Sequence, residues 1–261
     1  MIYETHAHYD DEKFDHDRVE LLSHLLREKN IGCVVNVGAN LSGSKRGIEL
    51  AEAYEDVYAS IGVHPEDVSE LSEDGIEWLR KNSNHEKVVA IGEIGLDYYW
   101  CKEQEERKNQ MYWFRRQLDL AKELDLPVII HSRDACEDTL DTIEEYNNLG
   151  LKGIIHCFSY TKEIARKYVD MGWYIGVGGV VTFKNGKKLV EVVREIPLEK
   201  IVLETDSPYM APEPHRGERN CSIYLNEVAK KIAEIKEISV EEVEATTYKN
   251  ALEIYKKSKR N

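Results

Sequence analysis

The most chemically suggestive residues of the chain stand near its N-terminus, where Glu4, His6 and His8 occupy alternate positions of the stretch ETHAH. In a β-strand, successive side chains point to opposite faces, so these three would project together. Carboxylate and imidazole groups on one face can bind a divalent metal ion or transfer protons. A solvated edge strand whose polar side carries imidazoles fits the spacing equally well, because histidines two positions apart are unspecific.

Four more residues of the same types each end an apolar run later in the chain: Glu93, His131, His156 and Asp206. If these runs are strands of an α/β barrel, their carboxyl ends meet at the face where active sites lie, because the loops that leave the strands converge there. The four side chains would then point into the same space as His6 and His8. A single histidine at a strand end is usually a hydrogen-bonded structural residue, but four histidines and two carboxylates in phase indicate a shared site.

A cluster of this kind without metal would hold several ionisable groups in a poorly solvated pocket, which is unfavourable unless the groups are paired or coordinated. Its ligands outnumber the three or four protein ligands that one zinc ion takes. Two divalent ions that share a bridging carboxylate therefore fit better than one. Such ligands accept Zn, Mn, Co and, less readily, Mg, so the sequence leaves the identity of the ions open.

The elements that must position these residues follow from apolar runs that alternate with segments of helical periodicity. Seven runs follow the ETHAH strand: NIGCVVNVG, VYASIGVHP, EKVVAIGEIGLD, LPVIIHS, LKGIIHCFS, WYIGVGG and EKIVLETDSP. Continuous Val and Ile runs are typical of parallel strands buried on both faces, so the pattern predicts either a doubly wound sheet or a closed barrel. In one intervening segment, apolar residues lie on one helix face: Met111, Phe114, Leu118, Ala121 and Leu124.

The chain has 261 residues, close to the about 250 residues of an α/β barrel, and no Pro-, Gly- or Ser-rich linker interrupts it. We therefore expect one domain over residues 1–261. Ser239 begins a capping box that predicts a final helix, and the last few residues, KKSKRN, look like a frayed basic tail. The Pro-rich loop 207–219 is long and chemically dense, which favours a functional role.

The net charge of −14 argues against a protein that coats nucleic acid non-specifically, because such binding depends on Lys and Arg that neutralise phosphates. A nuclease stays compatible with this charge, since a metal pair supplies positive charge where one phosphate must sit. No apolar run approaches the about 18 residues of a membrane span, so we expect a cytoplasmic protein with neither a membrane nor an obligate protein partner. Five scattered cysteines without a C-x-x-C pair indicate reduced thiols.

Six motifs, taken in order, closely resemble those of the TatD family of metal-dependent hydrolases, within the amidohydrolase superfamily: THAHYD, GVHPED, GEIGLDYY, HSRDA, HCFS and ETDSPYMAPEPHRGERN. The resemblance runs from Ile2 to about Tyr255. It implies a TIM-like (β/α)8 barrel with two divalent metal ions. The implied activity is that of a deoxyribonuclease, often a 3′ to 5′ exonuclease, with DNA as substrate, single-stranded or at its 3′ ends.

The resemblance also implies a full set of metal ligands: His6, His8, Glu93, His131, His156 and Asp206. The two N-terminal histidines and Asp206 would hold one ion, the two later histidines would hold the other, and Glu93 would bridge both. Glu93 and Asp206 are thus the implied catalytic residues, and Asp206 would accept the proton of the attacking water. Glu204 either tunes Asp206 or is a structural carboxylate paired within the barrel.

Substrate contacts are implied at the rim. His64, Arg133 and Arg216 would contact phosphate, although either arginine could equally be a salt-bridged structural residue. Tyr98, with the two aromatic residues after it, could stack bases of a single strand or belong partly to the core.

The chain departs from the family pattern at two places: Glu4 stands where many relatives have Asp, and Cys221-Ser222 replaces the usual Glu-Pro. Both changes put substrate preference in doubt more than metal binding. Two rival functions stay open. The same centre could hydrolyse a small cyclic amide, lactone or other acyl compound, or the chain could be a metal-storing or scaffold protein that has lost catalysis. DNA and RNA are not distinguished by the sequence.

Overall fold

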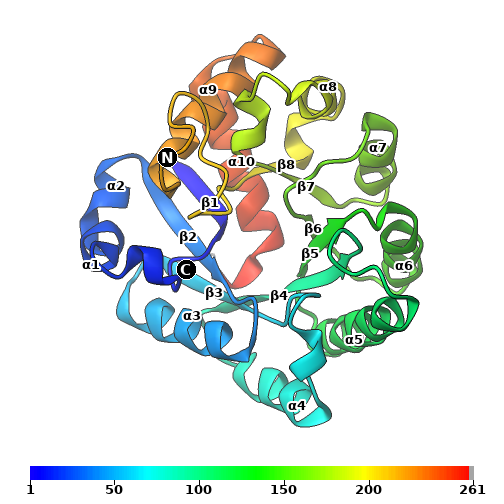
Figure 1. Cartoon of the computed structure of the whole chain (residues 1–261). Helices are drawn as coiled ribbons and strands as arrows, with labels where there is room; N and C mark the ends of the chain where they lie inside the picture. Colours follow the sequence, from blue (N-terminus) through cyan, green and yellow to red (C-terminus); the bar gives the residue numbers. More distant parts are fainter. Residues whose placement is uncertain (259–261) are drawn as a thin grey trace.

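Eight parallel strands form one sheet in chain order, and the sheet curves into a nearly closed TIM-like (β/α)8 barrel with helices around it (Figure 1). The computed structural model describes residues 1–258. The strands are β1 (Ile2–Ala7), β2 (Ile31–Val37), β3 (Val57–Ile61), β4 (Val88–Asp97), β5 (Val128–Arg133), β6 (Gly153–Ile155), β7 (Tyr174–Val177) and β8 (Ile201–Leu203). This strand order confirms the barrel and rules out the doubly wound sheet, in which the order of strands reverses.

The helices follow the strands along the outside of the barrel. They are α1 (Arg18–Glu20), α2 (Leu26–Glu28), α3 (Leu41–Ala53), α4 (Glu73–Asn82), α5 (Gln104–Glu123), α6 (Cys136–Asn148), α7 (Lys162–Asp170), α8 (Lys187–Glu195), α9 (Leu225–Lys236) and α10 (Val240–Ile254). Among residues 1–258, no helix combines the length and the apolar character that crossing a bilayer requires.

The apolar side chains of the strands form two layers of core. An outer layer, which includes Val34 and Ile130, packs against the surrounding helices. An inner layer, which includes Val35 and Ile129, fills the barrel and continues into the end of α10. Tyr255, just after α10, is fully buried, and its hydroxyl donates a hydrogen bond to the carbonyl oxygen of Thr5 at 3.1 Å. Helix α10, drawn red across the middle of Figure 1, thus closes the end of the barrel at which the strands begin.

The barrel closes between β1 and the segment after β8. One isolated parallel bridge joins Ala7 to Ser207. The backbone N–H of His8 donates to Ser207 O at 2.9 Å, and that of Asp206 donates to His6 O at 3.0 Å. The first and last strands therefore meet at their carboxyl ends, through the backbone of residues that the sequence marks as ligands.

Glu4 strengthens this closure from inside the barrel. Its fully buried carboxylate accepts hydrogen bonds from His6 N at 3.1 Å, from Thr205 N at 3.0 Å and from Thr205 Oγ1 at 2.7 Å. Burial raises the pKa of Glu4 to about 7, despite these hydrogen bonds. The residue that departs from the family pattern thus ties β1 to the segment after β8.

The local predictions are confirmed with small shifts. Of the expected apolar helix face, Phe114, Leu118 and Ala121 are buried in α5. Met111 and Leu124, at its two ends, are partly buried and pack against the core. The Ser239 side chain accepts from Glu242 N, as the capping box requires. The expected frayed tail is wrong for Lys256–Ser258, which form a 3-10 turn with Ser258 buried. Its remainder, 259–261, lies outside the described residues.

Candidate metal centre

All six predicted ligands lie together at the carboxyl ends of the strands. His6 belongs to β1 and His8 follows it, Glu93 and His131 belong to β4 and β5, and the other two residues follow β6 and β8. The donor atoms of these six residues and of His64 form three groups that share members, each within 4.8 Å: His6, His156 and Asp206; His6, His8 and Glu93; His64, Glu93 and His131. Because the strands are parallel, side chains far apart in the sequence share one space at this end of the barrel.

Glu93 stands between two sets of imidazoles. Its Oε2 lies 3.4 Å from His6 Nε2, whereas its Oε1 lies 2.9 Å from His131 Nδ1 and 3.8 Å from His156 Nε2. The two oxygens of one carboxylate thus face different histidines. This is the arrangement that a carboxylate shared by two cations requires.

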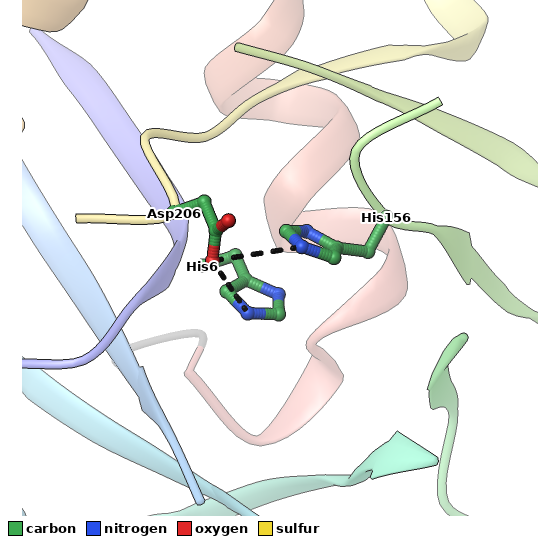
Figure 2. A group of neighbouring side chains, drawn as sticks. All are labelled: His6, His156 and Asp206. Atoms are coloured by element: carbon green, nitrogen blue, oxygen red, sulfur yellow. Dashed lines mark ion pairs between the residues drawn. The ribbon is translucent and has the colours of Figure 1, made fainter. Parts of the chain in front are cut away.

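Asp206 faces the histidines from the segment that follows β8. Its Oδ1 lies 3.3 Å from His8 Nε2, 3.8 Å from His6 Nε2 and 3.7 Å from His156 Nε2. Figure 2 shows the last two contacts, with both imidazole rings turned toward the carboxylate. The rings of His6 and His156 are stacked, with centroids 3.5 Å apart. Asp206 therefore caps a compact set of imidazole nitrogens.

Two histidines, His8 and His131, each make a contact outside the cluster, and this contact determines which of their ring nitrogens faces the cluster. His8 Nδ1 donates to the carbonyl oxygen of Val37 at 2.8 Å, because that oxygen can only accept. His131 Nε2 lies 3.1 Å from Asp97 Oδ2 on the side of the ring away from Glu93. These contacts leave one ring nitrogen of each histidine directed at the centre. Such outer partners commonly orient metal-binding histidines.

Glu204 plays the same part for His156. Its Oε2 lies 3.1 Å from His156 Nδ1, so the other ring nitrogen faces Glu93 and Asp206. The sequence left open whether Glu204 tunes Asp206 or is a structural carboxylate paired within the barrel. In the structure, the partner of Glu204 is His156, one of the predicted ligands. Asp97 was missed, although it stands four residues after Glu93 in one strand and so projects to the same side.

The charges of the cluster favour protons or cations at its centre. Within residues 1–258, every ion-pair contact of Glu93 and Asp206 is to a histidine, and none is to Lys or Arg. Burial raises the pKa of both carboxyls, but the neighbouring histidines outweigh it and hold the pKa of each below its usual range. Both carboxylates are therefore ionised at neutral pH.

The pKa values of three histidines shift upward, opposite to those of the two carboxylates. Burial lowers the pKa of His8, but the hydrogen bond and charge of Asp206 outweigh it and raise the pKa to about 9. Burial also lowers the pKa of His131 and of His156. The carboxylates around them outweigh it and raise these pKa values to about 9 and about 10. Burial and the neighbouring His156 lower the pKa of His6. Divalent cations would displace the protons from the imidazoles whose pKa is raised. This donor set therefore fits the metal ions that the sequence implies.

The predicted phosphate contacts occupy different depths. His64 lies within the cluster rather than at the rim, with Nε2 3.9 Å from Glu93 Oε1 and its ring centroid 4.3 Å from that of His131. Burial and the charge of His131 lower its pKa to about 3, so it is neutral. Arg133 and Arg216 are exposed, and each guanidinium lies 3.9 Å from an aromatic ring, of Tyr99 and Phe183 respectively.

Tyr98 does not present its ring to the mouth of the site. It is 8% exposed, its hydroxyl donates to Asp138 at 2.6 Å, and the guanidinium of Arg107 covers its ring at 4.4 Å. The exposed aromatic surface of this segment belongs to the next two residues, Tyr99 and Trp100. Of the three aromatic residues named for base stacking, Tyr98 is thus the one that belongs to the core, which the sequence does not show because Arg107 lies nine residues further along the chain.

Comparison with known proteins places the chain among related sequences over nearly its whole length. A family model described as TatD related DNase matches residues 3–256. The chain is 43% identical over 256 residues to the uncharacterized metal-dependent hydrolase YabD of Bacillus subtilis, with 98% of this chain and 99% of that protein covered. It is 34% identical over 257 residues to the uncharacterized metal-dependent hydrolase YcfH of Escherichia coli, with coverage of 98% and 96%.

Solved structures agree with the sequence relatives. The crystal structure of YjjV, a TatD homologue from Escherichia coli K12, matches with a TM-score of 0.89 at 28% identity and covers 98% of both chains. That of a TatD family hydrolase from Entamoeba histolytica matches with a TM-score of 0.84 at 25% identity and 97% coverage of both. Lactonase and organophosphorus hydrolase structures at about 15% identity share the fold.

Proposed function

Because the chain belongs to the TatD family of metal-dependent hydrolases, we propose that it is a deoxyribonuclease of the 3′ to 5′ exonuclease type that uses two divalent metal ions. The observation that carries this proposal is the position of Glu93, whose two oxygens face separate sets of imidazoles. Two-ion sites of this kind serve phosphodiester hydrolysis in many nucleases. The exposed Arg133 and Arg216 at the same face suit a phosphate-bearing substrate.

Each ligand has a defined place in this proposal. His6, His8 and Asp206 would hold one ion, the two later histidines would hold the other, and Glu93 would contact both. The chemistry supplied by bound divalent ions is Lewis acidity, which makes water nucleophilic near neutral pH and neutralises charge on the scissile phosphate. The histidine and carboxylate ligands accept Zn, Mn, Co and Mg, so the proposal does not depend on one metal.

Asp206 is the general base of the proposed reaction. Its side chain is 20% exposed, whereas that of Glu93 is 5% exposed, so Asp206 is the carboxylate that a water molecule reaches. Its lowered pKa keeps it ionised at neutral pH, ready to accept a proton from the attacking water. Glu204 and Asp97 hold the imidazoles of His156 and His131 in orientation while the substrate binds and leaves.

The test is degradation of end-labelled single-stranded DNA by chelator-stripped protein to which Mg, Mn, Co or Zn is added back separately, with Asp206→Asn alongside. Metal-dependent loss of nucleotides from the 3′ end that disappears in the variant supports the proposal. A parallel panel of cyclic amides and lactones tests the rival activity. Acyl turnover without DNA cleavage would replace the nuclease with a small-molecule hydrolase, and no turnover of any substrate by metal-loaded protein would favour a non-catalytic metal protein.

A further inference from the structure

Two large aromatic side chains stand exposed beside the metal centre. Tyr99 and Trp100 directly follow the segment that leaves β4, and their side chains are 41% and 64% exposed. Their rings meet edge to face with centroids 4.7 Å apart. Aromatic rings normally gain stability from burial, so an adjacent exposed pair at the catalytic end of a barrel indicates a surface that another molecule covers.

The position of this pair is fixed by the carboxylate that orients a metal ligand. Asp97 Oδ1 accepts hydrogen bonds from Tyr99 N at 2.9 Å and Trp100 N at 3.2 Å. The other oxygen of the same carboxylate lies 3.1 Å from His131 Nε2. Asp97 is itself fully buried. The backbone that carries the exposed rings is therefore tied to the same carboxylate that contacts His131, as expected for a surface that positions a substrate.

Arg133 completes the surface from the neighbouring strand. It stands two residues after His131 in β5, so it projects to the same side, and its backbone is in register with Asp97 of β4. Its guanidinium carbon lies 3.9 Å from the Tyr99 ring and 5.9 Å from the Trp100 ring. Stacking on aromatic faces holds a guanidinium in place while its N–H donors stay available.

The charge surroundings of Arg133 distinguish it from most other arginines of this acidic chain. Across residues 1–258, Arg133 has no carboxylate within ion-pair distance, whereas Arg115 pairs with Glu145 and Arg219 pairs with Asp17. In a chain with a net charge of −14, an exposed arginine at the catalytic face that lacks an anionic partner is suited to an incoming anion.

We propose that Tyr99, Trp100 and Arg133 form a nucleotide clamp, in which an unpaired nucleobase stacks on the exposed rings and Arg133 binds an adjacent phosphate. The inference rests on the proposed function and adds to it the residues that would hold an unpaired base beside the centre. A base within a duplex is already stacked on both faces, so only a single strand or a frayed end offers a face to Trp100. The rings grip any base, because every base has an aromatic face.

The first experiment compares two end-labelled single strands that differ only in the two nucleotides at the end being removed, which are normal in one and abasic in the other. Trp100→Ala is expected to lower kcat/KM on the normal strand by about 5- to 100-fold and to leave the abasic strand within about twofold. Trp100→Phe is expected to restore most of the loss. Tyr112→Ala is the matched control, because Tyr112 is 52% exposed on α5 and lies outside the clamp.

The second experiment tests the phosphate contact. Arg133→Ala is expected to lower kcat/KM by about 10-fold on an ordinary strand and to leave unchanged a strand whose neighbouring linkage is a neutral methylphosphonate. An equal loss on both strands, in either experiment, would make these residues merely structural and would overturn the clamp. The absence of any loss would overturn it as well.

A binding measurement separates failure of the clamp from failure of the nuclease. Fluorescence anisotropy with the Asp206→Asn variant compares affinity for the normal and abasic strands, with and without Trp100→Ala. If the wild-type protein cleaves no DNA with any metal, the proposed function fails, but base-dependent binding that needs Trp100 would still support the clamp. Binding that is equal for both strands would overturn it.

Discussion

Glu204 Oε2 lies 3.1 Å from Nδ1 of His156, on the side of the imidazole ring opposite to the nitrogen that faces Glu93 and Asp206. A buried carboxylate in this position stabilises this orientation of the ring. It also makes Nε2, the nitrogen that faces Glu93 and Asp206, a stronger metal ligand. The metal centre therefore extends one layer beyond the residues that would touch a cation.

Replacing Glu204 with Gln should lower the affinity for the second divalent ion by about 10- to 100-fold, because the amide cannot stabilise the ring as a carboxylate does. Isothermal titration of chelator-stripped protein measures this change. Glu253→Gln serves as a control, because Glu253 lies on α10, at the opposite end of the barrel. Unaltered affinity in the Glu204 variant would remove it from the metal centre.

Asp206→Asn should lower kcat by about 10²- to 10⁴-fold, because the amide cannot accept the proton of water. We expect a much smaller effect on folding, since the asparagine side chain has almost the same shape. Thermal melting measures stability, and elemental analysis of metal content separates a lost base from a lost ion. A wild-type rate in this variant would exclude Asp206 from the mechanism.

Metal affinity should rise with pH between about 6.5 and 9. The carboxylates raise the pKa of His8 and His131 to about 9 and that of His156 to about 10, so these imidazoles hold protons at neutral pH. Only the neutral form binds a cation, and binding must therefore release protons. Titration calorimetry at pH 7 in buffers of different ionisation enthalpy counts the released protons. A count of zero would contradict the raised pKa values.

The stability of chelator-stripped protein should fall as pH rises from about 7 to 10. The pKa of an unfolded histidine is about 6.5. Because the folded values are higher, the protonated imidazoles contribute stability that is fully present below about pH 6.5 and is lost as the pH passes their folded pKa values. Melting temperatures across this range provide the measurement. Metal-saturated protein should lack the decline, because its imidazoles are already deprotonated.

Glu4→Ala should lower the free energy of unfolding by about 3 kcal/mol, because three buried donors on His6 and Thr205 lose their acceptor. Glu4→Gln should lose less, since its amide oxygen still accepts. Urea unfolding of both variants measures the difference. Equal stability of the alanine variant and the wild type would mean that water replaces the carboxylate fully.

The apolar runs predicted parallel strands with helices between them but left a doubly wound sheet and a closed barrel open, and only the family resemblance implied the barrel. The residues at the carboxyl ends could be predicted because they depend on local patterns. Val and Ile runs mark the buried strands, and a ligand-type residue at the end of each strand must face the common axis. The six predicted ligands lie together for this reason, although no single strand shows which residues of the other strands they face.

The orienting contacts were harder to predict because they depend on register between strands. Asp97 reaches His131 only because Gly95 and Asp97 of β4 lie opposite His131 and Arg133 of β5. His64 was expected at the rim, but its Nε2 lies 3.9 Å from Glu93 Oε1. Pairing between distant segments and the path of loops are decided by packing, which periodicity does not encode.

The closure of the barrel has a consequence for biosynthesis. Glu4 and Thr205, 201 residues apart in the chain, are hydrogen-bonded across the seam, and the next residue, Asp206, donates its backbone N–H to His6. On the ribosome, every other ligand-type residue of the cluster is synthesised before Asp206. An unfinished polypeptide therefore has an open seam and an incomplete cluster, and both are completed only when the segment after its last strand meets its first strand.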